Sequence, residues 1–216
     1  MKPRLKTLLI LIWSSVFVTI MVFYRINLTW KITYFFLLRN LFLAWIPYGV
    51  TTFLKIMWKK IESKILIWFL FFVWLIFFPN AMYIITDFFH LKVRTWIPLW
   101  YDTLLLFGFA RNGLILGFLS LKDIQNIFLN KIKKIWNRIR IVILLLLSSF
   151  GIYIWRFLRR NSRDIVTNPI GVITDTFKIM FDFKNMQNSE MILIYFVLLM
   201  FGYLTIHFIQ NEDNKL

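Results

Sequence analysis

The sequence predicts an all-α fold, a polytopic membrane helical bundle with about six transmembrane helices and two interfacial amphipathic helices. Of its 216 residues, 60% are hydrophobic and 20% are aromatic, whereas soluble domains usually contain about 45–50% apolar residues. Apolar runs of about 18 residues or more recur, which is the length that a helix needs to cross a bilayer. Basic residues gather in the connections between these runs, as they do beside membrane spans. We therefore expect residues 1–216 to form a single membrane domain.

The first two spans are expected at about residues 7–24 and 32–57. The first span follows a basic N-terminus, but it is longer than the apolar part of a signal peptide and no cleavage site ends it, so we interpret it as an uncleaved span. The second span contains Arg39 about 10 Å from its start, at 1.5 Å per residue. A charge at that depth must be paired or reach the interface, which makes Arg39 a candidate functional residue.

The third span, about residues 65–85, leads into the stretch around which we expect the chain to be organised. Asn80, Tyr83, Asp87 and His90 follow one another at spacings of three, four and three residues. On a continuous α-helix these spacings keep the four side chains within an arc of roughly 80°. Because unpaired polar groups in a membrane are costly, this polar face is expected to have a structural or functional role.

The fourth span is expected at about residues 99–119. Asp102 lies in its first turn, where the helix dipole stabilises a carboxylate. Arg111 lies near the middle of the bilayer. Gly113 and Gly117 have the spacing that lets two membrane helices approach closely, although this pattern is common.

Two amphipathic helices and two further spans complete the predicted bundle. Residues of about 120–140 combine an apolar stripe with basic residues, which predicts a helix lying on the cytoplasmic membrane surface. The fifth span covers about residues 141–158, and an interfacial helix is expected on the outer side at about 169–184. The last span covers about residues 190–209.

The distribution of charge predicts the orientation of the bundle. Six spans place 14 of the 26 Lys and Arg residues on the side of the termini and 10 on the other side, with two inside spans. The positive-inside rule therefore places both termini in the cytoplasm. The polar stretches at the outer leaflet are then Arg39, the run from Asn80 to His90, Asp102, and the segment from Arg156 to Asp164.

Composition also limits the classes of partner. The formal net charge of +16 is typical of nucleic-acid-binding proteins, but cations beside membrane spans also set topology and contact anionic lipid headgroups. We therefore expect membrane lipids, including anionic headgroups, as partners and no nucleic acid, and the sequence indicates no protein partner. The chain contains no cysteine, which excludes disulfides, thiolate metal sites and cysteine nucleophiles.

Two kinds of candidate site residue lie on the predicted outer side. Carboxylates and an imidazole can act in acid–base catalysis, and these candidates are Asp87, His90, Asp102 and Asp164. Guanidinium, amide and phenol groups can bind a phosphate-bearing substrate, and these candidates are Arg39, Asn80, Tyr83, Arg156, Arg159 and Asn161. No cofactor is predicted, although Asp87 and His90 are weak candidates for a divalent metal.

These observations leave three functions open. The sequence favours an accessory or structural membrane protein, in which a salt bridge such as Arg39 with Asp87 or Asp102 fixes the bundle. One alternative is a membrane enzyme that acts on a lipid-linked, phosphate-bearing substrate at the outer leaflet. The other is a small transporter subunit, for which Arg111 and Asn112 mark the midplane.

Four motifs occur in order along the chain: Arg39–Pro47, Phe78–Leu91, Trp100–Asp102 and Arg156–Asp164. Together they resemble a bacterial integral-membrane family known as domain of unknown function 1361. The resemblance covers most of the chain. It implies a polytopic protein of a bacterial cell membrane, and it transfers no mechanism.

Overall fold

The computed structural model describes residues 3–58, 60–129, 134–157, 171, 174 and 186–213. Its elements are, in order, α1 (Pro3–Thr29), α2 (Phe36–Met57), α3 (Lys64–Tyr83), the 3₁₀ helix η1 (Ile84–His90), α4 (Leu99–Ile124), the π-helix η2 (Gln125–Leu129), α5 (Lys134–Phe157) and α8 (Met186–Asp213). Within the described ranges, the only β pairing is an isolated bridge between Arg94 and Ile97. The predicted all-α class is confirmed.

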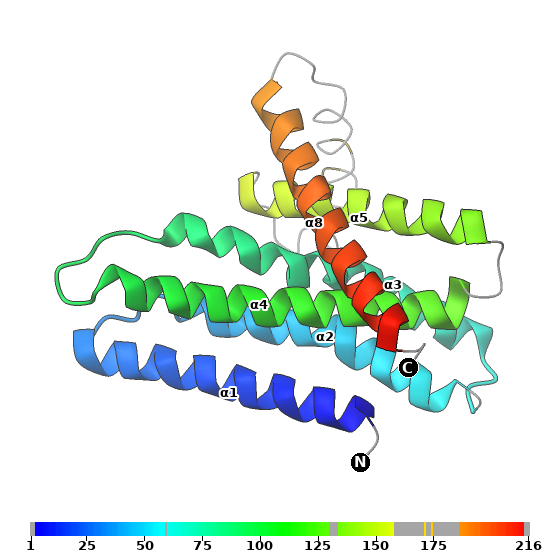
Figure 1. Cartoon of the computed structure of the whole chain (residues 1–216), viewed down its shortest axis with the longest axis horizontal. Helices are drawn as coiled ribbons and strands as arrows, with labels where there is room; N and C mark the ends of the chain where they lie inside the picture. Colours follow the sequence, from blue (N-terminus) through cyan, green and yellow to red (C-terminus); the bar gives the residue numbers. More distant parts are fainter. Residues whose placement is uncertain are drawn as a thin grey trace.

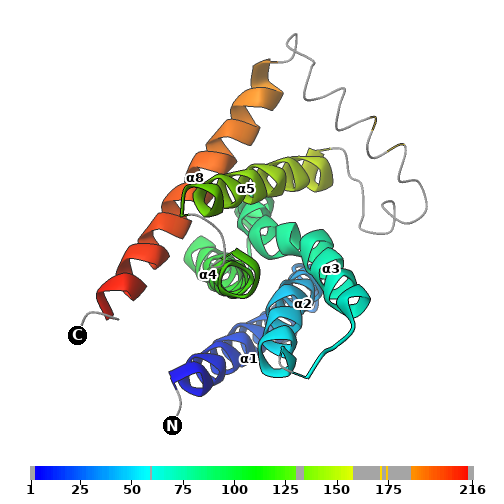
Figure 2. The ribbon, with the colours of Figure 1, turned by 90° about the vertical axis from the view of Figure 1, so that its right-hand side faces the viewer.

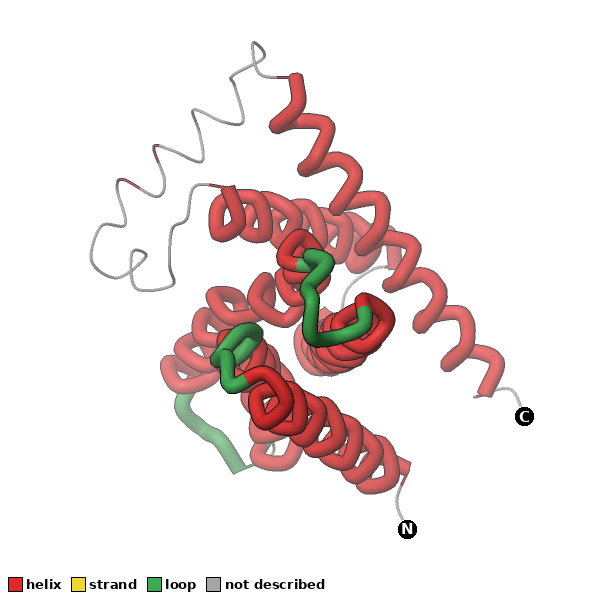
Figure 3. Tube along the Cα trace, turned by 90° about the vertical axis from the view of Figure 1, so that its left-hand side faces the viewer, coloured by secondary structure: helices red, strands yellow, loops and turns green. Residues whose placement is uncertain are grey.

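Helix α4 lies at the centre of the bundle and contacts α1, α2 and α3. Figures 1 and 2 show α1 and α2 on one side of α4 and α5 on the other, with α8 crossing obliquely against α5. Figure 3 looks onto the end of the bundle where α1 connects to α2 and η1 connects to α4. We call this end, formed by residues 25–34 and 90–98, the basic end.

Five segments of the described chain are long and apolar enough to cross a membrane: Leu5–Thr29, Lys64–His90, Leu99–Phe128, Trp136–Tyr153 and Glu190–Phe208. Many of their large apolar side chains are exposed on the surface of the bundle, where a membrane protein meets lipid rather than water. The chain is therefore a multi-pass membrane protein.

Helix α2 is not one of these five segments, yet it runs along the bundle beside α1 and α4 (Figure 1). Near its start Asn40 donates to Asp87 at 2.9 Å, and near its end Lys55 donates to Asp123 at 3.1 Å. Its contacts are with α3 and α4. Polar groups of α2 therefore bond to other helices, which is how polar residues are accommodated inside a membrane bundle.

The helix predicted to continue through Asp87 and His90 changes its geometry at Tyr83. There α3 ends and the chain continues as the 3₁₀ helix η1. At its start the Thr86 hydroxyl donates to the Tyr83 carbonyl oxygen at 2.8 Å. A 3₁₀ helix has about 3.0 residues per turn in place of 3.6, so Asp87 and His90 do not keep the positions that a continuous α-helix would give them relative to Asn80. The expectation of one continuous polar α-helical face was wrong.

The two predicted amphipathic ranges lie at the edges of the described structure. The range 120–140 is divided between the end of α4, the π-helix η2 and the first turns of α5, with 130–133 outside the described residues. Of the range 169–184, only residues 171 and 174 are described, and both are helical.

Two glycines of α4 let its backbone approach α3 closely, as their spacing predicted. A Cβ atom added to Gly113 would lie 2.6 Å from the Ala81 carbonyl oxygen, and one added to Gly117 would lie 2.7 Å from the Met82 methyl group. Both distances are well inside van der Waals contact. The junction of α3 and η1, which places Asp87, is therefore held against α4 at these glycines.

We predict that Gly113→Ala destabilises the protein, because the new methyl group meets the backbone oxygen of Ala81. Overpacking of this kind costs about 1–3 kcal/mol, which thermal unfolding in detergent will measure. The matched control is Gly49→Ala, since a Cβ at Gly49 meets nothing within 4 Å, and Ala is the better helix former by about 1 kcal/mol. Equal melting temperatures for Gly113→Ala and the unchanged protein would contradict the close approach.

Candidate functional site

A buried ion pair joins α1 to α4 at the basic end. Arg25 Nε donates to Asp102 Oδ1 at 2.7 Å and Arg25 Nη2 donates to Asp102 Oδ2 at 3.1 Å. Each residue is only 1% exposed. Arg25 Nη1 also donates to the Thr33 hydroxyl at 2.9 Å. This bidentate, charge-assisted geometry is the strongest form of such a contact, and it fixes the α1–α2 connection against the first turn of α4.

Tyr34 links this pair to the second connection. Its ring contacts two guanidinium groups, with Arg25 Cζ 4.6 Å and Arg94 Cζ 5.1 Å from the ring centre. Its hydroxyl donates to the His90 carbonyl at 3.0 Å. Burial raises the pKa of the Tyr34 phenol and the negative charge of Asp102 raises it further, so Tyr34 stays a neutral donor.

The backbone of the α1–α2 connection is strained where it makes these contacts. Trp30 and Tyr34 have positive φ angles of 53° and 70°, a region that bulky side chains seldom adopt. Such strain persists only where surrounding contacts hold it, and it is common at functional sites. Here the Tyr34 contacts with Arg25, Arg94 and His90 hold the connection.

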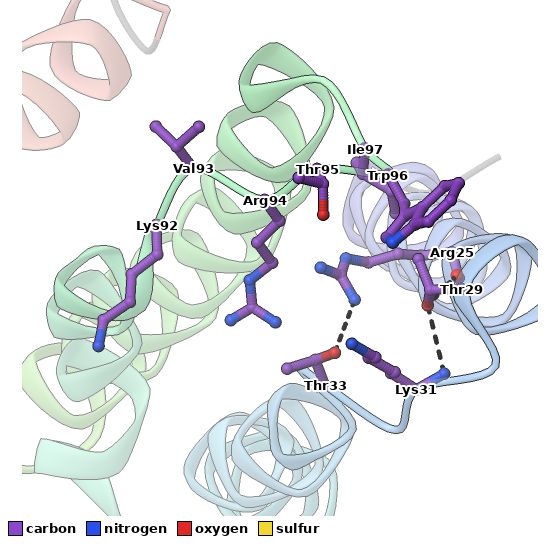
Figure 4. Close-up of a pocket in the computed structure, with 10 residues that line it drawn as sticks. All are labelled: Arg25, Thr29, Lys31, Thr33, Lys92, Val93, Arg94, Thr95, Trp96 and Ile97. Carbon is purple, nitrogen blue, oxygen red and sulfur yellow. Dashed lines mark hydrogen bonds between the residues drawn. The ribbon is translucent and has the colours of Figure 1, made fainter.

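A cavity of about 390 Å³ opens between the two connections at this end. It is lined by ten residues, of which four are cations: Arg25, Lys31, Lys92 and Arg94. Three threonines line it too: Thr29, Thr33 and Thr95. Figure 4 shows the cationic ends of Arg25, Lys31 and Arg94 turned toward one another around Thr33, with Lys92 to one side. We call this the basic cavity.

The basic cavity has more positive than negative charge. Asp102, which binds Arg25, is the one carboxylate seen pairing with a lining residue among the described side chains. In the same described part of the chain, Lys31, Lys92 and Arg94 make no ion pair with Asp or Glu. Cations held close together repel one another, and an anion bound between them offsets this repulsion. The arrangement can therefore bind an anion.

Exposed tryptophans lie on both connections of the basic end and in the first turn of α4. Trp30 in the first connection is 90% exposed, and Trp96 in the second is 79% exposed and lines the cavity. Trp100, in the first turn of α4, is exposed as well. Tryptophan is enriched where a membrane meets water. Three exposed tryptophans at one end of a multi-pass bundle are typical of the end that lies at a membrane–water interface.

Comparison with known proteins identifies the family. Residues 39–205 match the family described as Protein of unknown function (DUF1361), which is well over half of the chain. The chain belongs to the DUF1361 family. Comparison with curated proteins and with solved structures found no match. The part that matches DUF1361 includes Lys92, Arg94 and Asp102, whereas Arg25 and Lys31 come before it.

The described residues that the charge distribution predicts at the outer leaflet do not form one cluster. Asp102 pairs with Arg25, which lines the basic cavity. Asp87 is buried elsewhere and accepts a hydrogen bond from Asn40. Asn80 is also buried, and its Nδ2 atom has no hydrogen-bond partner among the described residues. Tyr83 is half-buried. None of Asp87, Asn80 and Tyr83 lines the basic cavity.

Two further candidates lie on the surface. Arg39 is exposed on α2 and does not line the basic cavity. The His90 side chain is exposed, and its ring lies edge-on to Phe36 with ring centres 5.0 Å apart. The expected pairing of Arg39 with Asp102 is therefore replaced by the pairing of Arg25 with Asp102.

The last four candidates lie at or beyond the end of α5, where the described part of the chain is interrupted. Arg159, Asn161 and Asp164 lie outside the described residues, and Arg156 is described only as part of the last turn of α5. Within the described ranges, no three His, Asp or Glu side chains come together in a way that could hold a metal ion.

Sequence reasoning missed most of the basic cavity. It treated Arg25 and Lys31 as parts of a short turn, and it treated Lys92 and Arg94 as parts of a loop. One signal was available, because both connections fall on the side that the positive-inside rule disfavours, and each contains two cations. That Tyr34 would bring the two connections together has no sequence signal of its own.

We predict that Arg25→Gln strongly destabilises the protein. Removing one partner of a buried ion pair leaves the other charge uncompensated, which costs roughly 3–5 kcal/mol. Chemical unfolding in detergent measures this loss. Lys55→Gln is the matched control, because Lys55 pairs with Asp123 but its side chain is 47% exposed. An exposed pair contributes only about 0–1 kcal/mol, so similar losses in the two variants would refute a special role for the Arg25–Asp102 pair.

Proposed function

We propose that this DUF1361 protein is an accessory protein of the cell membrane that binds the anionic, phosphate-bearing headgroup of a lipid in the basic cavity. One observation carries the proposal. Four cations line a single cavity of about 390 Å³, and the described structure provides one carboxylate, Asp102, to neutralise them.

The donors in the cavity favour phosphate as the anionic group. Guanidinium groups bind phosphate through paired hydrogen bonds, and lysine adds a mobile point charge. Arg25 and Arg94 are both held in place against the Tyr34 ring, so little freedom is lost when they bind an anion. The hydroxyl of Thr95, which lines the same cavity, adds a neutral donor.

The surroundings of the cavity favour a lipid over a free anion. Val93 and Trp96 line it and are largely exposed, and they lie at the end of a bundle whose outer surface is apolar. A lipid can place its headgroup among the cations while its chains follow this apolar surface. A free anion would use only the polar half of the site.

The orientation proposed from the charge distribution assigns the cavity to the outer leaflet. The count of Lys and Arg favours both termini in the cytoplasm, and the basic end is the end opposite the α2–α3 connection (Figure 1). Two neutral and exposed positions can test this, Val93 at the basic end and Asn126 at the opposite end of α4.

Binding is favoured over catalysis by the character of the lining. The ten described lining residues are cations, threonines and apolar residues, so they supply no carboxylate or imidazole for general acid–base catalysis. Transport also gains no support from Arg111, which is exposed and donates to the Ser14 hydroxyl at 3.2 Å. The enzyme and the transporter subunit therefore stay predictions from sequence.

We predict that the purified protein binds phosphatidylglycerol in preference to phosphatidylcholine with the same chains, as measured by native mass spectrometry. Arg94→Gln should weaken the binding of phosphatidylglycerol by about tenfold, because a charge-assisted hydrogen bond is lost. Arg39→Gln is the control, since it removes the same charge from the exposed surface of α2 outside the cavity. Equal weakening by both changes would point to general surface charge and contradict the proposed site.

We predict that Val93→Cys is labelled in intact cells by a membrane-impermeant maleimide, whereas Asn126→Cys is labelled only after the cells are opened. The chain has no native cysteine, so each signal reports one position, and neither change alters the charge that sets topology. The opposite labelling pattern would place the basic cavity in the inner leaflet.

A further inference from the structure

We propose that the basic cavity selects lipids whose headgroup ends in a terminal phosphate with about two negative charges, over lipids whose phosphate is a diester. This inference rests on the proposed function and adds the chemical class of the headgroup to it. The shared chemistry is the terminal phosphate, and a lipid monophosphate or a lipid diphosphate can supply it.

The charge balance of the cavity is the first argument. Asp102 neutralises Arg25 through two hydrogen bonds. Lys31, Lys92 and Arg94 line the same cavity without an acidic partner among the described residues. A diester phosphate carries one negative charge and leaves most of this excess uncompensated. A terminal phosphate carries about −1.5 to −2 at pH 7, and a diphosphate carries more.

The direction of the donors is the second argument. In Figure 4 the ends of Arg25, Lys31 and Arg94 approach the space around Thr33 from three sides. A terminal phosphate presents three unesterified oxygens, whereas a diester presents two. Three cationic donors that converge from three sides can each bind a separate oxygen of a terminal phosphate, whereas on a diester two of them would have to share one oxygen.

The rigidity of two of these donors is the third argument. The Arg25 guanidinium is held by Asp102 and by the Thr33 hydroxyl at 2.9 Å, and the Arg94 guanidinium lies on the Tyr34 ring. Fixed donors cannot move to follow a smaller anion. Lys31, which is exposed, is the one of the three with freedom to close on the ligand, because its side chain is long and flexible.

The volume of the cavity admits either source of the terminal phosphate. About 390 Å³ falls within the range of about 300–1,000 Å³ that is usual for small-molecule sites. Lys92 lies to one side of the three converging cations (Figure 4), where it can contact the second phosphate of a diphosphate. The two sources can therefore be separated by experiment.

The test compares three lipids with identical chains on the purified full-length protein. The probes are dioleoyl phosphatidic acid, dioleoylglycerol diphosphate and dioleoyl phosphatidylglycerol, and the dissociation constant of each is measured in the same detergent. We expect phosphatidic acid or the diphosphate to bind about tenfold tighter than phosphatidylglycerol, as one added charge-assisted contact implies. Tighter binding of the diphosphate than of phosphatidic acid, reduced by Lys92→Gln, would identify the diphosphate as the source.

Two variants keep the test independent of folding. Lys31→Gln changes an exposed side chain and should bring the affinities for phosphatidic acid and phosphatidylglycerol closer together. Arg39→Gln should leave their ratio unchanged. Equal affinities for all three lipids would overturn the selectivity while leaving the proposed function intact. Failure of every anionic lipid to bind would overturn both.

Discussion

The contact on which the basic end depends is the buried pair of Arg25 and Asp102. Taking two charges out of water costs several kcal/mol per ion, and only good geometry with additional hydrogen bonds offsets that cost. Both conditions hold here, because the guanidinium binds both carboxylate oxygens and also the Thr33 hydroxyl. The pair joins residues 77 positions apart. It therefore fixes where the α1–α2 connection lies on α4, and the position of the basic cavity follows from it.

The same reasoning explains how α2 holds buried polar side chains inside a membrane bundle. Its Asn40 and Thr51 are buried, and they bond to Asp87 on η1 and to Asp123 near the end of α4. A polar side chain is costly against lipid but not against a helix that offers it a partner. Hydropathy along the chain reflects only the cost of a polar side chain against lipid, because it contains no information about partners on other helices.

The sequence predicted the elements of this fold better than their contacts. Apolar runs between basic connections predicted the helices, and the spacing of Gly113 and Gly117 predicted a close approach that the structure confirms. The change to a 3₁₀ helix after Tyr83 was missed, because an apolar run has the same composition in either helical form. The basic cavity was missed for a different reason. Arg25 and Arg94 both contact the Tyr34 ring, and no local pattern records a contact between connections so far apart in the sequence.

If the basic cavity binds an anion as proposed, binding is coupled to the stability of the bundle. Its walls are two connections held together by the Tyr34 hydrogen bond to His90 and by the contacts of the Arg25 and Arg94 guanidinium groups with the Tyr34 ring. When no anion is bound, Lys31, Lys92 and Arg94 repel one another, and this repulsion acts against these contacts. A bound anion attracts all three cations and so replaces the net repulsion with a net attraction. A ligand that binds only the folded form stabilises it in proportion to the logarithm of its concentration. An anionic lipid at this site would therefore act on the same two connections that the Arg25–Asp102 pair positions.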